Sequence, residues 1–119
     1  MKAAIYSQKK DLDTFLYLNR FISELALREV SVVLHAEMAE NLNFSKEFET
    51  FSGKEGLKNK NVNIVFSFGG DGTILNALTF IQDLEIPIIG VNTGRLGFLA
   101  NFRKDQIFDV LDSIILEKN

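Results

Sequence analysis

Short apolar runs and longer amphipathic segments alternate along the chain. Four apolar runs, at residues 2–7, 30–35, 62–68 and 86–91, predict strands buried on both faces. The second run is rich in β-branched residues, which favour strands. Pro87 is compatible with the fourth strand because it stands near the beginning of that strand.

Three other segments carry apolar residues at spacings of three and four, as amphipathic helices do. They cover residues 11–29, roughly 72–84 and 104–118. Asp11 or Asp13 is expected to stabilise the beginning of the first helix, as an N-cap or as a first-turn charge.

Two segments are less regular. Phe44, Phe48 and Phe51 stand at helical spacing, so a short helix is predicted within residues 36–51, with Ser45 near its beginning. Residues 52–61 contain two glycines and three lysines and are predicted to form a mobile, solvated surface loop. The apolar residues 98–102 are assigned to no element.

Strands that alternate with helices predict an α/β fold, a three-layer Rossmann-like parallel sheet with flanking helices. In such folds ligands bind at the carboxyl ends of the strands. Three loops follow strands in this way, at residues 8–11, 68–73 and 92–97. We therefore expect these loops to meet at one edge of the sheet.

Composition excludes several classes of function. The 119 residues include no cysteine and one histidine, which excludes a disulfide scaffold, thiol catalysis, iron–sulfur ligation and a His-His metal site within this chain. The net charge of −3 argues against nucleic-acid or anionic-membrane binding, and no apolar run approaches the length of a membrane span, about 18 residues. We expect a cytoplasmic protein whose residues 1–119 fold as one domain.

The sequence Gly69-Gly70-Asp71-Gly72-Thr73 joins the third predicted strand to the next helix. Glycines let backbone N–H groups approach an anion, and a helix N-terminus attracts phosphate. Asp71 repels phosphate oxygens, but its carboxylate can take a proton from an attacking hydroxyl or help to hold magnesium in phosphoryl transfer. The alternative is structural, with Asp71 capping the helix. The residues alone leave both interpretations open.

A second glycine-bearing turn begins at Asn92, after the fourth strand. Asn92 is suited to bonding a ribose or its own turn. Arg95 is suited to a phosphate, although a lone loop arginine is more often solvated. Phe98 can stack on a purine ring or pack into the core.

Together, GGDGT at 69–73 and GVNTGRLGFL at 90–99 resemble the N-terminal domain of the NAD kinase (ATP-NAD kinase) family. The first motif is shared with a wider superfamily that includes diacylglycerol, sphingosine and 6-phosphofructo-kinases. The second, GVNxGxLGFL, is characteristic of NAD kinases in this order and at this distance. The resemblance covers nearly the whole chain.

The resemblance implies phosphorylation of the 2′-hydroxyl of the adenosine ribose of NAD, which makes NADP, with ATP and a divalent metal, usually Mg²⁺. It makes Asp71 the proton acceptor, whereas no residue is assigned as a metal ligand. The substrate-binding residues that it implies are Asp71, Gly72, Leu75, Asn76 and Phe98, and the phosphate and site-loop residues are Gly69, Gly70, Thr73, Asn92 and Gly94. Asn76 stands where the family often has a basic residue, and a homo-oligomer, dimer or tetramer, is implied for the full-length protein.

Family members carry a second, β-rich domain that begins with an Asn-Glu or Asn-Asp pair, and this sequence contains neither pair. We therefore expect the chain to be a fragment, inactive by itself, whose surface around Phe98, Leu99 and Phe102 faces the missing domain. Two alternatives to an NAD kinase stay open, a non-catalytic nucleotide-binding module and a lipid or sugar kinase of the GGDGT superfamily.

Overall fold

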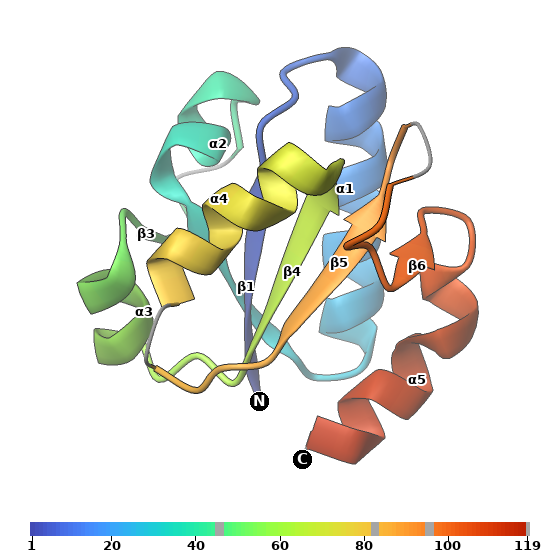
Figure 1. The fold of residues 1–119 in the computed structure, drawn as a ribbon. Helices are drawn as coiled ribbons and strands as arrows, with labels where there is room; N and C mark the ends of the chain where they lie inside the picture. Colours follow the sequence, from blue (N-terminus) through green and yellow to red (C-terminus); the bar gives the residue numbers. More distant parts are fainter. Residues whose placement is uncertain (45–46, 82–83, 95–96, 119) are drawn as a thin grey trace.

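Six parallel strands form one sheet in the order β3-β2-β1-β4-β5-β6 (Figure 1). The computed structural model describes residues 1–44, 47–81, 84–94 and 97–118. The strands are β1 (Lys2–Ser7), β2 (Ser31–His35), β3 (Glu49–Phe51), β4 (Ile64–Gly69), β5 (Ile88–Asn92) and β6 (Phe102–Arg103). The helices are α1 (Leu12–Leu27), α2 (Ala36–Asn41), α3 (Lys54–Asn59), α4 (Asp71–Ile81) and α5 (Ile107–Lys118).

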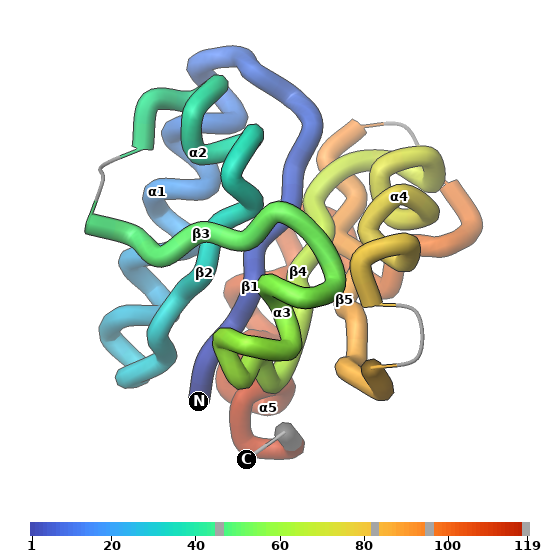
Figure 2. The backbone as a smooth tube through the Cα atoms, turned by 90° about the vertical axis from the view of Figure 1, so that its left-hand side faces the viewer, coloured from blue at the N-terminus to red at the C-terminus, as the bar shows by residue number. Residues whose placement is uncertain are grey.

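Helices cover both faces of the sheet, which confirms the three-layer prediction. Alternate residues of the central strands face opposite sides, so that Phe66 and Phe68 pack with α1 and α5, whereas Val65 packs with α3 and α4. Figure 2 shows α1 and α4 on opposite sides of the strands. The strand order reverses between β1 and β4, so a ligand crevice is expected at their carboxyl ends.

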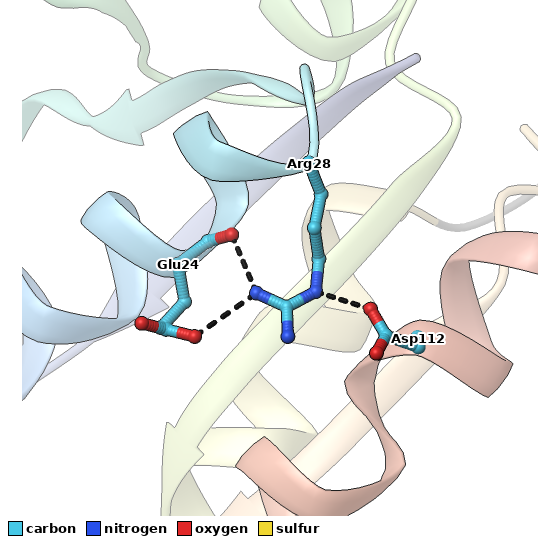
Figure 3. A network of polar contacts seen from close by, with 3 residues as sticks. All are labelled: Glu24, Arg28 and Asp112. Carbon is cyan, nitrogen blue, oxygen red and sulfur yellow. Dashed lines mark hydrogen bonds and ion pairs between the residues drawn. The ribbon is translucent and has the colours of Figure 1, made fainter.

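Helix α1 begins as its sequence predicts, because the Asp11 carboxylate accepts a hydrogen bond from the backbone N–H of Thr14 at 2.8 Å. At its other end Arg28 joins α1 to α5. The Arg28 guanidinium contacts the Glu24 carboxylate and backbone carbonyl and also the Asp112 carboxylate on α5 (Figure 3). Because Glu24 is partly exposed and Asp112 largely exposed, we expect these ion pairs to contribute little to stability.

The helix predicted from three phenylalanines within residues 36–51 is wrong, since α2 ends at Asn41 and Phe51 belongs to β3. Ser45, the expected beginning of that helix, lies outside the described residues. Phe44 and Phe48 pack instead against the core on the α1 face, where the Phe44 ring lies 5.2 Å from that of Phe15. Their spacing of four reflects burial against neighbouring elements and not a helix of their own.

The surface loop predicted at residues 52–61 is also wrong, because this segment contains α3. Leu57 is fully buried there and anchors the helix against the sheet. Gly56 permits the close approach, since a Cβ at this position would lie 3.0 Å from the Cβ of Phe51. The lysines and glycines of this segment resemble the composition of a solvated loop, so composition alone did not indicate that Leu57 is buried.

The remaining differences concern boundaries. Residues 98–102, which the sequence assigned to no element, lead into the two-residue edge strand β6, while β4 extends to Gly69 and α4 already begins at Asp71. Among the described residues, no helix is both long enough and apolar enough to cross a membrane.

Candidate functional site

The turn between β4 and α4 depends on the first glycine of the GGDGT segment. Gly69 has a φ of +155°, and a Cβ there would lie 2.6 Å from Thr73 Oγ1. Both the backbone conformation and the lack of space therefore require glycine. The next glycine, Gly70, is exposed, and its carbonyl accepts the N–H of Ile74 as the helix begins.

The Asp71 carboxylate bonds to the loop that follows β5. Its Oδ1 atom accepts hydrogen bonds from the backbone N–H groups of Phe98 and Leu99, each at 3.0 Å, and Oδ2 is also 3.0 Å from the N–H of Phe98. These hydrogen bonds, that from Leu99 first, lower the pKa of Asp71 below its ordinary value. The carboxyl group is therefore ionised at neutral pH.

This arrangement decides against Asp71 as a helix cap. Within the described part of the chain, the hydrogen bonds of its carboxylate go to residues 98 and 99, 27 and 28 positions away, and not to the first turn of α4. The carboxylate therefore joins the two motifs that the sequence singled out. A side chain in this position stands at the N-terminus of α4, where the helix dipole also favours negative charge.

The three loops expected at the carboxyl edge do meet. The Thr73 hydroxyl donates to Gln8 Oε1 at 2.8 Å, which joins the loops after β4 and β1. Asn92 Oδ1 accepts the N–H of Gly94 at 2.8 Å, so the amide orders its own turn. A Cβ at Gly94 would lie 3.7 Å from Lys9 Nζ, which places the Lys9 ammonium beside that turn.

The expected substrate-binding residues lie on the exposed side of this edge. Gly72, Leu75 and Asn76 are exposed on α4, and Leu75 follows Asp71 by one helical turn. Phe98 is 98% exposed, so its ring has no place in the core of this chain. Arg95 lies outside the described residues.

The side chain of Asn76, although the residue is exposed, also has a partner in the sheet. Burial raises the pKa of the Tyr6 hydroxyl, whereas hydrogen bonds with the side chains of Gln8 and Asn76 act in the opposite direction. Asn76 thus interacts with Tyr6 near the end of β1, which gives it a structural partner in addition to the expected role at the substrate.

Lys9 and Lys104 bring positive charge to this edge. Both line a cavity of about 140 Å³ beside Thr93 and the N-terminus of α1. Ammonium groups suit phosphate oxygens, but Asp11 and Asp13 line the same cavity and offset part of the charge.

Carboxylates do not cluster in the described residues. No group of three or more Asp, Glu or His side chains is placed there to hold a metal ion. Mg²⁺ is commonly bound by one or two carboxylates together with the phosphates of a substrate, an arrangement that needs no such group.

Comparison with known proteins assigns this chain to a family. Residues 8–118 match the ATP-NAD kinase N-terminal domain family. The chain belongs to the NAD kinase family. Among relatives, the NAD kinase of Christiangramia forsetii is 36% identical over 122 residues, which cover 99% of this chain and 41% of that protein. The NAD kinase of Methanothermobacter thermautotrophicus is 32% identical over 96 residues, 81% of this chain and 32% of that protein.

A crystal structure of yeast NADH kinase complexed with NADH has the same fold. It aligns with 99% of this chain and 38% of its own chain, with a TM-score of 0.79 and 22% identity. This NAD kinase domain accordingly spans 41% of the length of the first curated relatives that it matches.

Sequence reasoning missed two parts of the site in this NAD kinase domain. The N–H groups of Phe98 and Leu99 act through the backbone, so no side-chain pattern indicates that they bind Asp71. Gly97 was noted only as part of a turn, although a Cβ there would lie 2.8 Å from Asp71 Cγ. The available signal was its place at the end of the predicted ligand loop, directly before the candidate aromatic residue Phe98.

Proposed function

We propose that the protein to which this chain belongs transfers a phosphoryl group from ATP to the 2′-hydroxyl of the adenosine ribose of NAD and so forms NADP. The single observation that carries the proposal is the ionised Asp71 carboxylate, placed between both motif loops at the carboxyl edge of the sheet. Membership of the NAD kinase family supports the choice of substrates.

In the proposed reaction the 2′-oxygen attacks the γ-phosphorus, the bond to the ADP oxygen breaks, and the hydroxyl proton passes to Asp71. A carboxylate with a lowered pKa is present in its accepting form at neutral pH. Gly72, Leu75, Asn76 and Phe98 would contact NAD, which their exposure on one edge permits. A divalent metal, Mg²⁺, would neutralise charge on the phosphates when ATP binds.

The glycine-rich turn at residues 69–73 would bind the phosphate groups of the substrates. Gly69, Gly70 and Thr73 form the N-terminal approach to α4, where backbone N–H groups and the helix dipole favour an anion. Asn92 and Gly94 would shape the opposite loop, since their side-chain-to-backbone hydrogen bond fixes the turn after β5.

One observation favours the alternative of a non-catalytic nucleotide-binding module. Asp71 already accepts hydrogen bonds from two backbone N–H groups, and this pairing would be equally useful if the carboxylate only held the loop. The assay of an Asp71 variant separates the two functions. The lipid or sugar kinase has no such support, because the family match is to NAD kinases.

The test uses the full-length protein to which this chain belongs and measures the NADP that forms from NAD in the presence of ATP and Mg²⁺. Replacing Asp71 with Asn keeps the shape but removes the basic oxygen, so kcat should fall by about 10²–10⁴-fold. A loss smaller than tenfold would refute the proton-accepting role. The 119-residue chain alone is expected to give no appreciable turnover, because the rest of the NAD site would lie in the remaining length.

A cytoplasmic location and a homo-oligomer belong to the same proposal. The cysteine-free composition is compatible with a reducing compartment.

A further inference from the structure

Gly97 stands against the Asp71 carboxylate with no space for a side chain between them. We propose that Gly97 is a positioning residue, whose missing Cβ lets the loop at residues 97–99 close on Asp71 and fix the orientation of its carboxylate. The positioning rests on geometry alone. Its kinetic consequence rests on the proposed role of Asp71 as proton acceptor.

The steric contact is specific to this glycine. A Cβ at Gly97 would lie 2.8 Å from Asp71 Cγ, closer than Cβ atoms approach other atoms in proteins, and it would also overlap Oδ1. Its distance of 3.1 Å from Oδ2 would be unusually tight as well. A Cβ at Gly94, in the same turn, would instead lie 3.7 Å from Lys9 Nζ. A methyl group at Gly97 would therefore displace the Asp71 carboxylate, whereas one at Gly94 would make an ordinary contact with Lys9.

Backbone strain does not explain the requirement at this position. Gly69 is the glycine with a positive φ among the described residues, so an alanine at 97 would meet no conformational penalty of that kind. The expected effect of a methyl group is therefore confined to the neighbouring carboxylate. Because that carboxylate is the end of a short, rotatable side chain, it should turn away and leave the rest of the domain in place.

Turning away would break the hydrogen bonds that orient Asp71. Both N–H donors, those of Phe98 and Leu99, directly follow Gly97 in the chain. Phe98 also presents its exposed ring on the same loop. One short segment thus holds the proposed base and carries the proposed contact with NAD. Because the atoms that a methyl group at Gly97 would displace are those of the Asp71 carboxylate, the change should affect the chemical step more than substrate binding.

The first experiment compares Gly97→Ala with Gly53→Ala in the protein at the length of its relatives. Gly53 is a matched control outside the site, where a Cβ would meet no described atom within 4 Å. We expect Gly97→Ala to lower kcat by roughly 10–100-fold with a smaller change in KM, because a displaced catalytic group costs about 10²-fold. We also expect the acidic limb of the kcat/KM profile to move to higher pH, since Asp71 loses the hydrogen bonds that lower its pKa.

A second measurement is independent of activity. The pKa of the Asp71 carboxyl, followed by ¹³C NMR, should be higher in Gly97→Ala than in wild type, with unfolding temperatures that match. Equal pKa values in the two proteins would overturn the proposal, whereas a shifted pKa with unchanged kcat and pH profile would overturn only its kinetic consequence. If Asp71→Asn remains active while the NMR shift occurs, Gly97 still positions Asp71 and it is the proposed catalytic function that fails.

Discussion

The hydroxyl of Thr73 donates a hydrogen bond to the side-chain oxygen of Gln8 at 2.8 Å. These residues follow β4 and β1, the two central strands between which the strand order reverses. The bond therefore bridges the crevice in which α/β proteins bind ligands, and it joins the GGDGT turn to a loop 65 residues earlier.

Thr73→Val should lower the free energy of unfolding by about 0.5–1.5 kcal/mol, because it removes this hydrogen bond and keeps the shape of the side chain. The measurement is urea unfolding of Thr73→Val, Gln8→Ala and the double variant. If the two side chains are partners, the second substitution should add little to the first. Fully additive effects would contradict the pairing.

Leu57→Ala should destabilise the domain by about 2–5 kcal/mol, since this fully buried leucine anchors α3. Leu27→Ala is the matched control, because Leu27 is 77% exposed and its loss should change stability by no more than about 0.5 kcal/mol. Both are measured by chemical unfolding. Similar, small effects would indicate that residues 54–59 do not pack as a helix on the sheet.

His35 is expected to make stability depend on pH. It is buried among the rings of Tyr6, Phe51 and Phe80, and burial lowers its pKa below the ordinary value of about 6.5. The unfolded chain therefore binds a proton more readily, so stability should fall as pH drops through about 6.5 toward the lower pKa of the folded state.

The corresponding variant is His35→Phe, which keeps an aromatic ring and removes the titrating group. Its free energy of unfolding, relative to wild type, should rise steadily as pH is lowered from 7 to 5. Carboxylates titrate in both proteins, so their contribution cancels in the difference. Parallel curves would show that His35 takes up its proton equally in both states.

Phe98→Ala should leave the free energy of unfolding within about 0.5 kcal/mol of wild type, because the ring is 98% exposed. In the protein at the length of its relatives, KM for NAD should rise by about tenfold, as loss of one aromatic contact implies. Leu116→Ala, which removes another exposed apolar side chain, should change neither quantity. An unchanged KM would argue against contact between Phe98 and the substrate.

Short apolar runs were sufficient to predict the central strands, and spacings of three and four were sufficient to predict α1, because these elements bury their apolar side chains against one another. The Asp11 cap and the meeting of the three loops at one edge also follow from local rules. Each of these features depends on a single element or on the general geometry of parallel sheets.

Features that depend on two distant segments could not be predicted in this way. Residues 54–59 form a helix because one leucine and one glycine fit against β3, which composition does not record. Phe51 is buried, and Phe44 and Phe48 are partly buried, by tertiary contacts that override the helical spacing of these phenylalanines. The hydrogen bonds of Asp71 involve backbone N–H groups, which every residue but proline carries.

The central place of β1 has a consequence for the order of folding. β1 pairs with β2 nearby in the chain, but its other neighbour, β4, begins at Ile64, and the Lys2 N–H bonds to Asn63, 61 residues later. Asp71 meets residue 98 only after β5 is also in place. During synthesis the half of the sheet around β1 and β2 can therefore assemble early, whereas the carboxylate site closes among the last contacts of the domain.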